Sequence, residues 1–196
     1  MLQGKKMNMG CKLLLVLTLW AMSTEAFPRD EQKRECHLSS YVTLLPWKQI
    51  IFNNVRDKFE TITLPSTQIC TTSIFHRDWQ VKELSVLDRM ILVEAQLNFT
   101  IDMLKEFGDP SLSKELSSPL EILGYIRNDI KRCIQDQHQH QPQPHQSDKK
   151  LTTWLNKVQK AKRTETPACL ETAVIFNLLR MLNTDLSCAA YKERCR

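Results

Sequence analysis

The chain has 196 residues, a formal net charge of +5 and only four glycines. This charge is too small to predict nucleic-acid binding. The scarcity of glycine, with no tandem of alternating strands joined by turn dipeptides, disfavours an all-β module.

Residues 1–26 have the three parts of a secretory signal: a lysine-containing start, an apolar run at 13–22, and small residues up to Ala26. The apolar run is far shorter than the roughly 20 residues that span a bilayer. We expect cleavage after Ala26, with Ser23 as the alternative, and a single secreted domain at 27–196 without a membrane anchor. Cleavage removes three lysines and Glu25, so the net charge falls from +5 to +3.

Six cysteines remain after Cys11 leaves with the signal: Cys36, Cys70, Cys133, Cys169, Cys188 and Cys195. An even number in an oxidising compartment predicts three disulfides, although spacing alone leaves 15 pairings open. A zinc site is the weaker alternative because no closely paired C-x-x-C is present. We therefore expect neither a metal nor a cofactor.

Helical periodicity begins at residues 44–60, where apolar side chains recur at fourfold spacing with Pro46 in the first turn. The stripe consists of Trp47, Ile51, Val55 and Phe59. After a loop, residues 79–107 carry a shifting apolar stripe that predicts a short helix followed by a long one, ended by 108–110.

The next helix is predicted to start at Ser118, with Pro119 in its first turn and Glu121 completing a capping box. Residues 135–147 contain Gln, His and Pro without apolar residues, so they are predicted to form a solvated linker. A short helix follows around 151–158, and Thr166 with Pro167 begins the last one.

The last helix carries one aromatic residue on an unexpected side. At about 100° per residue, an apolar stripe forms within roughly 80°, and its members are Leu170, Val174, Leu178 and Met181. Phe176 falls opposite, together with Thr172, Leu179 and Asn183. Two interpretations remain open: packing on a second side of the helix, or an exposed anchor for a protein partner.

The sequence contains no G-x-S-x-G, H-E-x-x-H or Gly-rich phosphate loop, and its histidines have no evident nucleophile partner. His138, His140 and His145 are a candidate metal set, but a polar linker is the commoner explanation. We therefore expect no enzymatic activity. An all-α bundle stabilised by disulfides, with apolar anchors on its surface, suits a receptor ligand.

Ordered motifs along the mature chain resemble those of one family, the type III interferons or interferon lambda cytokines. The matching stretches are "CHLSSY" (36–41), "LVEAQLNFTIDMLKE" (92–106), "SSPLEILGYI" (117–126), "CIQ" (133–135), "PQP" (142–144), "LTTWLNKVQKA" (151–161) and "CLETAVIFNLLRMLNTDLSC" (169–188). The resemblance implies a bundle of about six helices, A to F, with 135–147 joining D and E. It also implies the bridges Cys36–Cys133, Cys70–Cys169 and Cys188–Cys195.

The family resemblance also implies two receptor contacts. A high-affinity interferon lambda receptor chain docks on helix A, the A–B loop and helix F, and the second chain of the interleukin-10 receptor docks more weakly on helices A and D. By resemblance, the receptor-binding residues are Pro46, Gln49, Gln68, Phe176, Leu179 and Asn183.

Three of these positions depart from the family pattern. Leu179 replaces a phenylalanine of the apolar pair, Gln49 replaces a leucine of the mammalian proteins, and Gln68 replaces a loop tryptophan of one of them. The departures indicate a non-mammalian lineage whose receptor has changed with the ligand.

The expected function is that of a secreted, monomeric antiviral cytokine that assembles both receptor chains and triggers JAK–STAT signalling. The alternatives are another helical cytokine, interleukin-10-like or type I interferon, and a lipid-binding or membrane-active helical protein.

Asn98 in "NFT" is a candidate glycosylation site on a polar helix face. The lysines at 149–162 would suit a weak glycosaminoglycan contact, although a solvated helix face is the commoner explanation.

Overall fold

The computed structural model describes residues 36, 38–41, 46–63, 70, 73–140, 145–191 and 195. Its helical elements in chain order are η1 (Leu38–Tyr41), α2 (Pro46–Thr63), η2 (Val81–Glu83), α3 (Val86–Lys105), α4 (Pro110–His140), α5 (Lys149–Thr164), α6 (Pro167–Arg180), the π-helical turn η3 (Met181–Asp185) and α7 (Leu186–Ala190). Over these residues there is no strand, which confirms the all-α prediction. The predicted signal at 1–26 lies outside the described residues.

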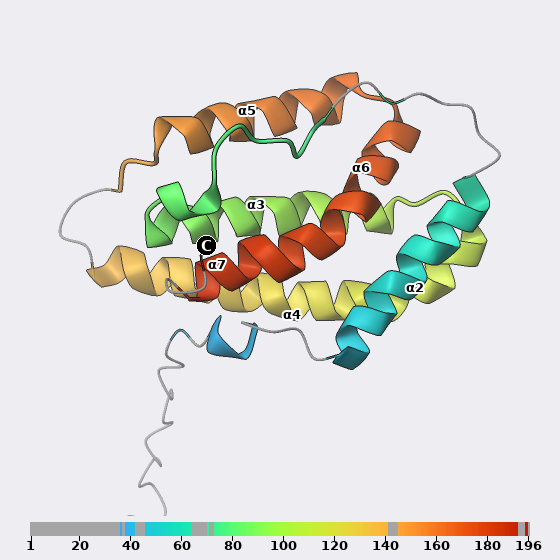
Figure 1. The fold of residues 1–196 in the computed structure, drawn as a ribbon, viewed down its shortest axis with the longest axis horizontal. Helices are drawn as coiled ribbons and strands as arrows, with labels where there is room; N and C mark the ends of the chain where they lie inside the picture. Colours follow the sequence, from blue (N-terminus) through green and yellow to red (C-terminus); the bar gives the residue numbers. More distant parts are fainter. Residues whose placement is uncertain are drawn as a thin grey trace, which may run out of the picture. The chain divides into compact units, whose positions relative to one another are not determined.

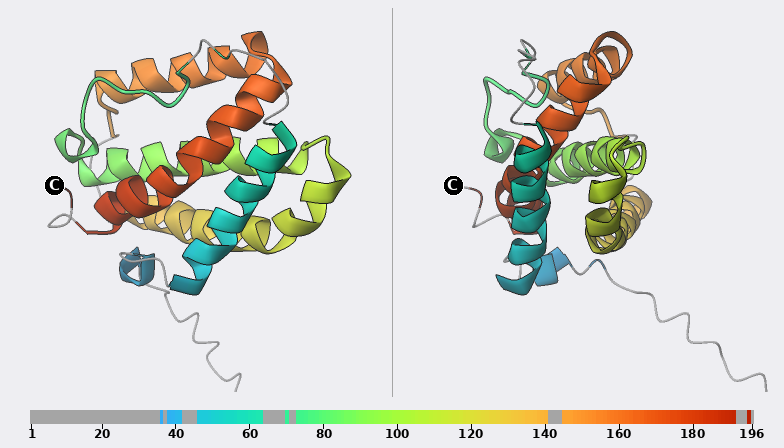
Figure 2. Two further views of the ribbon diagram at one scale, coloured as in Figure 1. Left: turned by 45° about the vertical axis from the view of Figure 1, so that its right-hand side comes forward. Right: turned by 90° about the vertical axis from the view of Figure 1, so that its right-hand side faces the viewer.

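The long helix α3 is the centre of the bundle and contacts α4, α5, α6 and α7. Figure 1 shows α3 between α5 and α4. In the right view of Figure 2, α2 and the continuous run of α6, η3 and α7 lie on one side of α3 and α4. The apolar core therefore fills the space around α3 from several sides.

Two helix starts have side-chain caps, of which only the one at Thr166 was predicted. The hydroxyl of Thr166 accepts a hydrogen bond from the Cys169 amide, and Pro167 occupies the first turn of α6. Ser85 caps α3 in the same way, accepting from the amide of Asp88. These caps satisfy amides that have no partner within their own helix.

The predicted helix start at Ser118 is wrong, because α4 begins at Pro110. Asp109 caps it, with its carboxylate accepting from the Ser111 amide at 2.7 Å. Pro119 lies inside the helix, where its ring removes one backbone hydrogen bond, and Figure 2 shows α4 changing direction part-way along. The buried Leu112 and Leu116 before this bend hold the first turns on the core.

The other end of α4 also differs from the expectation, since the helix continues to His140. Residues 135–140, predicted as the start of a linker, are therefore helical. Their side chains are exposed except for the half-buried Asp136, which fits the expectation that they add nothing to the core.

The buried face of α2 is rotated from the predicted one. Phe52, Val55 and Phe59 are buried, whereas Trp47 is 52% exposed rather than part of the core. The fourfold spacing identified the last two members, whereas Trp47 lines a surface groove between α2 and α4 and stays half exposed.

The structure contains three disulfides with the pairing that the resemblance implied, two of them between distant parts of the chain. Cys36 pairs with Cys133 of α4, and Cys70 pairs with Cys169 at the start of α6. The third joins Cys188 of α7 to Cys195. The second bridge ties the α2–α3 loop, residues 64–80, to the last helix.

Candidate receptor-binding surface

Phe176 projects from α6 away from the core. Leu170, Val174 and Leu178 are buried, while 54% of Phe176 is exposed, so the outward orientation predicted from helical angles is confirmed. The ring meets the buried Phe59 of α2 edge to face, with centroids 6.4 Å apart and planes at 82°. The base of the ring is thus held in place while the remainder faces solvent.

The other expected contact residues do not all gather around Phe176. Leu179 packs partly against the core, and Asn183 is exposed in the π turn. Pro46 and the half-buried Gln49 lie at the start of α2, about 20 Å and about 15 Å along the helix axis from Phe59. Gln68 lies outside the described residues.

The loop between α2 and α3 is anchored by apolar side chains. Ile74 and Phe75 are buried, and the Phe75 ring meets that of Phe99 on α3 at 5.6 Å. From the other side, Lys157 Nζ on α5 donates to the carbonyl oxygens of Ser73 and His76 at 2.8 and 3.2 Å. The described part of the loop is therefore held between α3 and α5.

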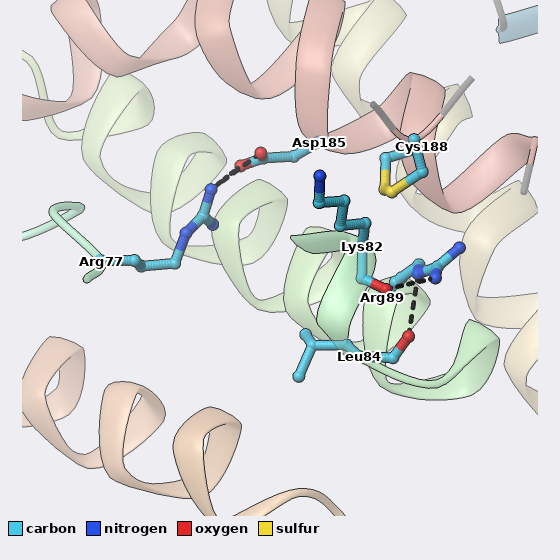
Figure 3. The surroundings of a disulfide bond; sticks show 7 residues. Arg77, Lys82, Leu84, Arg89, Asp185 and Cys188 are labelled. Atoms are coloured by element: carbon cyan, nitrogen blue, oxygen red, sulfur yellow. Dashed lines mark hydrogen bonds and ion pairs between the residues drawn. A yellow bond between two sulfur atoms is a disulfide. The ribbon is translucent and has the colours of Figure 1, made fainter. Parts of the chain in front are cut away.

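A buried polar network joins this loop to the last helix. Arg77 donates two hydrogen bonds to the Asp185 carboxylate, at 2.8 and 3.0 Å (Figure 3). Gln96 of α3 donates to the same carboxylate at 2.9 Å and accepts from the side-chain amide of Asn177 at 3.0 Å.

Arg180 extends the network toward solvent. Its Nε donates to Asn177 Oδ1 at 2.9 Å, and its Nη1 lies 3.4 Å from Asp185 Oδ2. Burial lowers the pKa of Arg180, an effect that Asp185 opposes and Arg77 reinforces. The site is thus arranged around one fully buried carboxylate that faces two guanidinium groups.

A groove of about 460 Å³ lies over this network. Its walls come from the loop, including Phe75 and Trp79, and from the last helix, including Arg180, Asn183 and Thr184. Asn183 therefore lies beside the loop, and its contact with a receptor stays a prediction.

A second set of exposed apolar side chains lies elsewhere on α2 and on α4. Trp47 and Ile50 on α2 are exposed, as is Tyr125 on α4, at 61%. Trp47 and Tyr125 line a groove of about 380 Å³, together with Lys48 and Ile122. The Lys48 ammonium stands 5.4 Å from the Trp47 ring, which favours an ordered indole.

Sequence reasoning missed the buried network, although part of its signal was present. Asp185 falls within the apolar stripe of the last helix, where an acidic residue requires a partner. Gln96 and Thr100 likewise occupy fourfold positions between Leu92 and Leu104, and all four are buried. The sequence pattern could have identified these positions as buried polar groups. It could not have identified Arg77, on a distant loop, as their partner.

Two surface expectations have mixed outcomes in the structure. Asn98 is half-buried on α3, and Asp102 on the same face accepts from Lys162 of α5 at 2.9 Å, so this face is less open than its polar sequence predicted. Lys149, Lys160 and Arg163 on α5 are exposed. The glycan and the glycosaminoglycan contact stay predictions.

The described residues contain no cluster of three acidic, histidine or cysteine side chains arranged for a metal ion. His145, one of the three histidines considered above as metal ligands, has its Nε2 atom 2.9 Å from the carboxylate of the buried Asp88. None of the described helices is long and apolar enough to cross a bilayer.

The all-helical bundle, its three bridges and its exposed aromatic anchors define a disulfide-stabilised helical cytokine. The Interleukin-28A family model matches residues 33–192. The chain is 37% identical to interferon lambda-3 of Gallus gallus over 95% of its length and 97% of the relative's. It is 32% identical to interferon lambda-1 of Homo sapiens (82% and 78%) and 30% identical to interferon lambda-2 of Mus musculus (93% and 96%).

The chain therefore belongs to the interferon lambda family, the type III interferons. This is a cytokine family and not an enzyme family, which confirms both expectations. It also decides against the alternatives of another helical cytokine class and of a lipid-binding protein.

Proposed function

We propose that this interferon is a secreted antiviral cytokine that brings two receptor chains together, the interferon lambda receptor chain and the second chain of the interleukin-10 receptor. Assembly of the chains would bring their associated Janus kinases together and activate STAT proteins. The ligand performs no chemistry itself. The observation that carries the proposal is Phe176, a large aromatic side chain left half in solvent on an otherwise well-packed helix.

The high-affinity surface is assigned to α2, the α2–α3 loop, α6 and the π turn. Phe59 joins α2 to α6 through its contact with Phe176, and the buried network joins the loop to the π turn. An aromatic side chain with a rigid, preformed base loses little conformational entropy on binding, which is typical of residues that dominate interface energies. Phe176 has such a base in the Phe59 ring.

The second-chain surface is assigned to the groove between α2 and α4. Trp47 and Tyr125 supply apolar area there, and Trp47 lies 12 residues before Phe59, or about 18 Å along the α2 axis. Two receptor chains can therefore contact the same helix at different heights. Once the first chain is bound, capture of the second occurs within the membrane plane at high effective concentration, so a weak second interface is sufficient.

The proposal is tested with the native mature protein. Binding is measured to each receptor ectodomain alone and to both together, and STAT phosphorylation is recorded in cells that carry both chains or only one. We expect tight binding to the interferon lambda receptor chain, cooperative capture of the second chain, and a signal only in cells with both. A signal in cells lacking the interferon lambda receptor chain, or binding to neither ectodomain, would contradict the proposal.

A further inference from the structure

The α2–α3 loop poses a structural problem for the proposed receptor surface. It spans residues 64–80, longer than most connections in compact domains, and its described part forms no regular secondary structure before η2. A loop of this kind binds a partner tightly only when its position is fixed beforehand, because ordering it on binding costs free energy. The contacts that fix it are therefore relevant to affinity.

The pair of Arg77 and Asp185 is the strongest candidate for fixing the loop. Their side chains are only 5% and 0% exposed, and among the described ion pairs no other has both members more than nine-tenths buried. Both hydrogen bonds come from Arg77 Nη2, and the Gln96 amide donates a third to the Oδ2 atom of the same carboxylate. The carboxylate is thus held from α3 while it holds the loop.

Stability alone does not account for this pair. A buried ion pair commonly contributes no more than an apolar pair of equal volume, because desolvation of both charges offsets their attraction. What the pair does supply is a fixed position, because its charge-assisted hydrogen bonds form only when Arg77 Nη2 lies within bonding distance of both carboxylate oxygens. The pair defines where the loop lies along the last helix.

The π turn places the residue that holds the loop and the exposed candidate contact residue on opposite sides of the segment. Asp185 ends the turn and points to Arg77, as Figure 3 shows, while Asn183 two residues earlier is exposed. The Arg77 guanidinium also lies 5.2 Å from the Trp79 ring, which it supports on the other wall of the groove. π turns of this kind are frequent at functional sites.

We infer that Arg77 and Asp185 are positioning residues for the receptor: their buried ion pair fixes the α2–α3 loop against the last helix and thereby sets affinity for the interferon lambda receptor chain. The inference rests on the proposed function and names residues that the receptor need not touch. It predicts that the pair governs one interface and not the other.

The test replaces the pair by apolar side chains of similar volume, Arg77→Met with Asp185→Leu. The double variant is expected to keep its helical circular dichroism but to have a lower thermal midpoint, because the buried Gln96 amide loses its acceptor. Its affinity for the interferon lambda receptor ectodomain should fall at least tenfold, mainly through slower association, because only a fraction of molecules has the loop in place. Binding to the second-chain ectodomain should be unchanged.

Two further variants complete the design. Arg77→Lys keeps the charge but loses the guanidinium geometry, so it is expected to fold and to show an intermediate loss of affinity. Lys162→Met with Asp102→Leu removes an exposed ion pair between α5 and α3, and should leave both affinities unchanged. Hydrogen exchange at residues 73–80 should rise only in the Arg77 variants.

Native affinity in the double variant and in Arg77→Lys would overturn the inference, as would equal losses at both ectodomains with a lowered thermal midpoint. If the double variant does not fold, Arg77→Lys alone decides: native affinity, or equal losses at both ectodomains with a lowered thermal midpoint, would overturn the inference. Failure of the native protein to bind either ectodomain would overturn the proposed function and this inference with it.

Discussion

Replacement of Phe176 by alanine is expected to weaken receptor binding far more than it weakens the fold. A phenylalanine buries about 150 to 250 Å² when fully covered, and 54% of this side chain is exposed. Roughly 100 Å² therefore remains for a partner to cover. At about 25 cal/mol per Å², this is about 2.5 kcal/mol, or about a 60-fold rise in Kd.

The expected effect on stability is small by comparison. The variant loses one edge-to-face contact with Phe59, worth about 1 kcal/mol, and this loss is partly offset by the higher helix propensity of alanine. For a domain of this size, 1 kcal/mol corresponds to about 2 to 4 °C in Tm.

Surface-binding kinetics with the interferon lambda receptor ectodomain, alongside thermal unfolding by circular dichroism, would separate these effects. Most of the loss should lie in the dissociation rate, as is usual for interface residues. A Kd within threefold of native, accompanied by a fall of more than about 10 °C in Tm, would show that Phe176 is a core residue. The receptor surface would then have to be sought away from α6.

Three more outcomes follow from the structure. Tyr125→Ala should weaken binding to the second-chain ectodomain about tenfold and leave binding to the interferon lambda receptor ectodomain unchanged. Binding to each ectodomain would be measured, with Phe176→Ala as the reciprocal control. Equal losses at both ectodomains would refute the assignment of the two receptor chains to separate surfaces. Changing Cys188 and Cys195 to alanine opens a short loop of separation 7 and should cost about 2 to 3 kcal/mol in chemical unfolding. Burial raises the pKa of Glu171, so its ionised form is disfavoured in the folded state. Glu171→Gln should therefore raise Tm at pH 7. Below about pH 4 it should not raise Tm, because glutamate is then protonated in both the folded and the unfolded state. A gain that is independent of pH would exclude this cause.

Local signals predicted the last helix well because its cap and its stripe agree. Thr166 and Pro167 begin α6 as expected, and one buried stripe runs along it, leaving Phe176 outside. The same kind of signal failed at Ser118, where Pro119 is instead tolerated inside α4. Burial of Leu112 and Leu116 outweighs the cost of an interior proline, and no local pattern reveals that burial in advance.

The candidate site was predictable only in part for a related reason. The angular position of Phe176 follows from the helix alone, so its exposure could be derived. The ion pair between Arg77 and Asp185 joins residues 108 positions apart, and only the folded chain shows that they meet. The disulfide pairing came from family resemblance, because spacing left every pairing open.

The disulfide connectivity sets an order of events during synthesis. Cys36 and Cys70 leave the ribosome well before their partners Cys133 and Cys169, at separations of 97 and 99 residues. Each of these bridges can close only after its second cysteine has been made, so residues 36 and 70 remain without their native partners during most of synthesis. A bond formed between Cys36 and Cys70 in that interval would have to be exchanged by thiolate attack before the native bridges of this interferon could form.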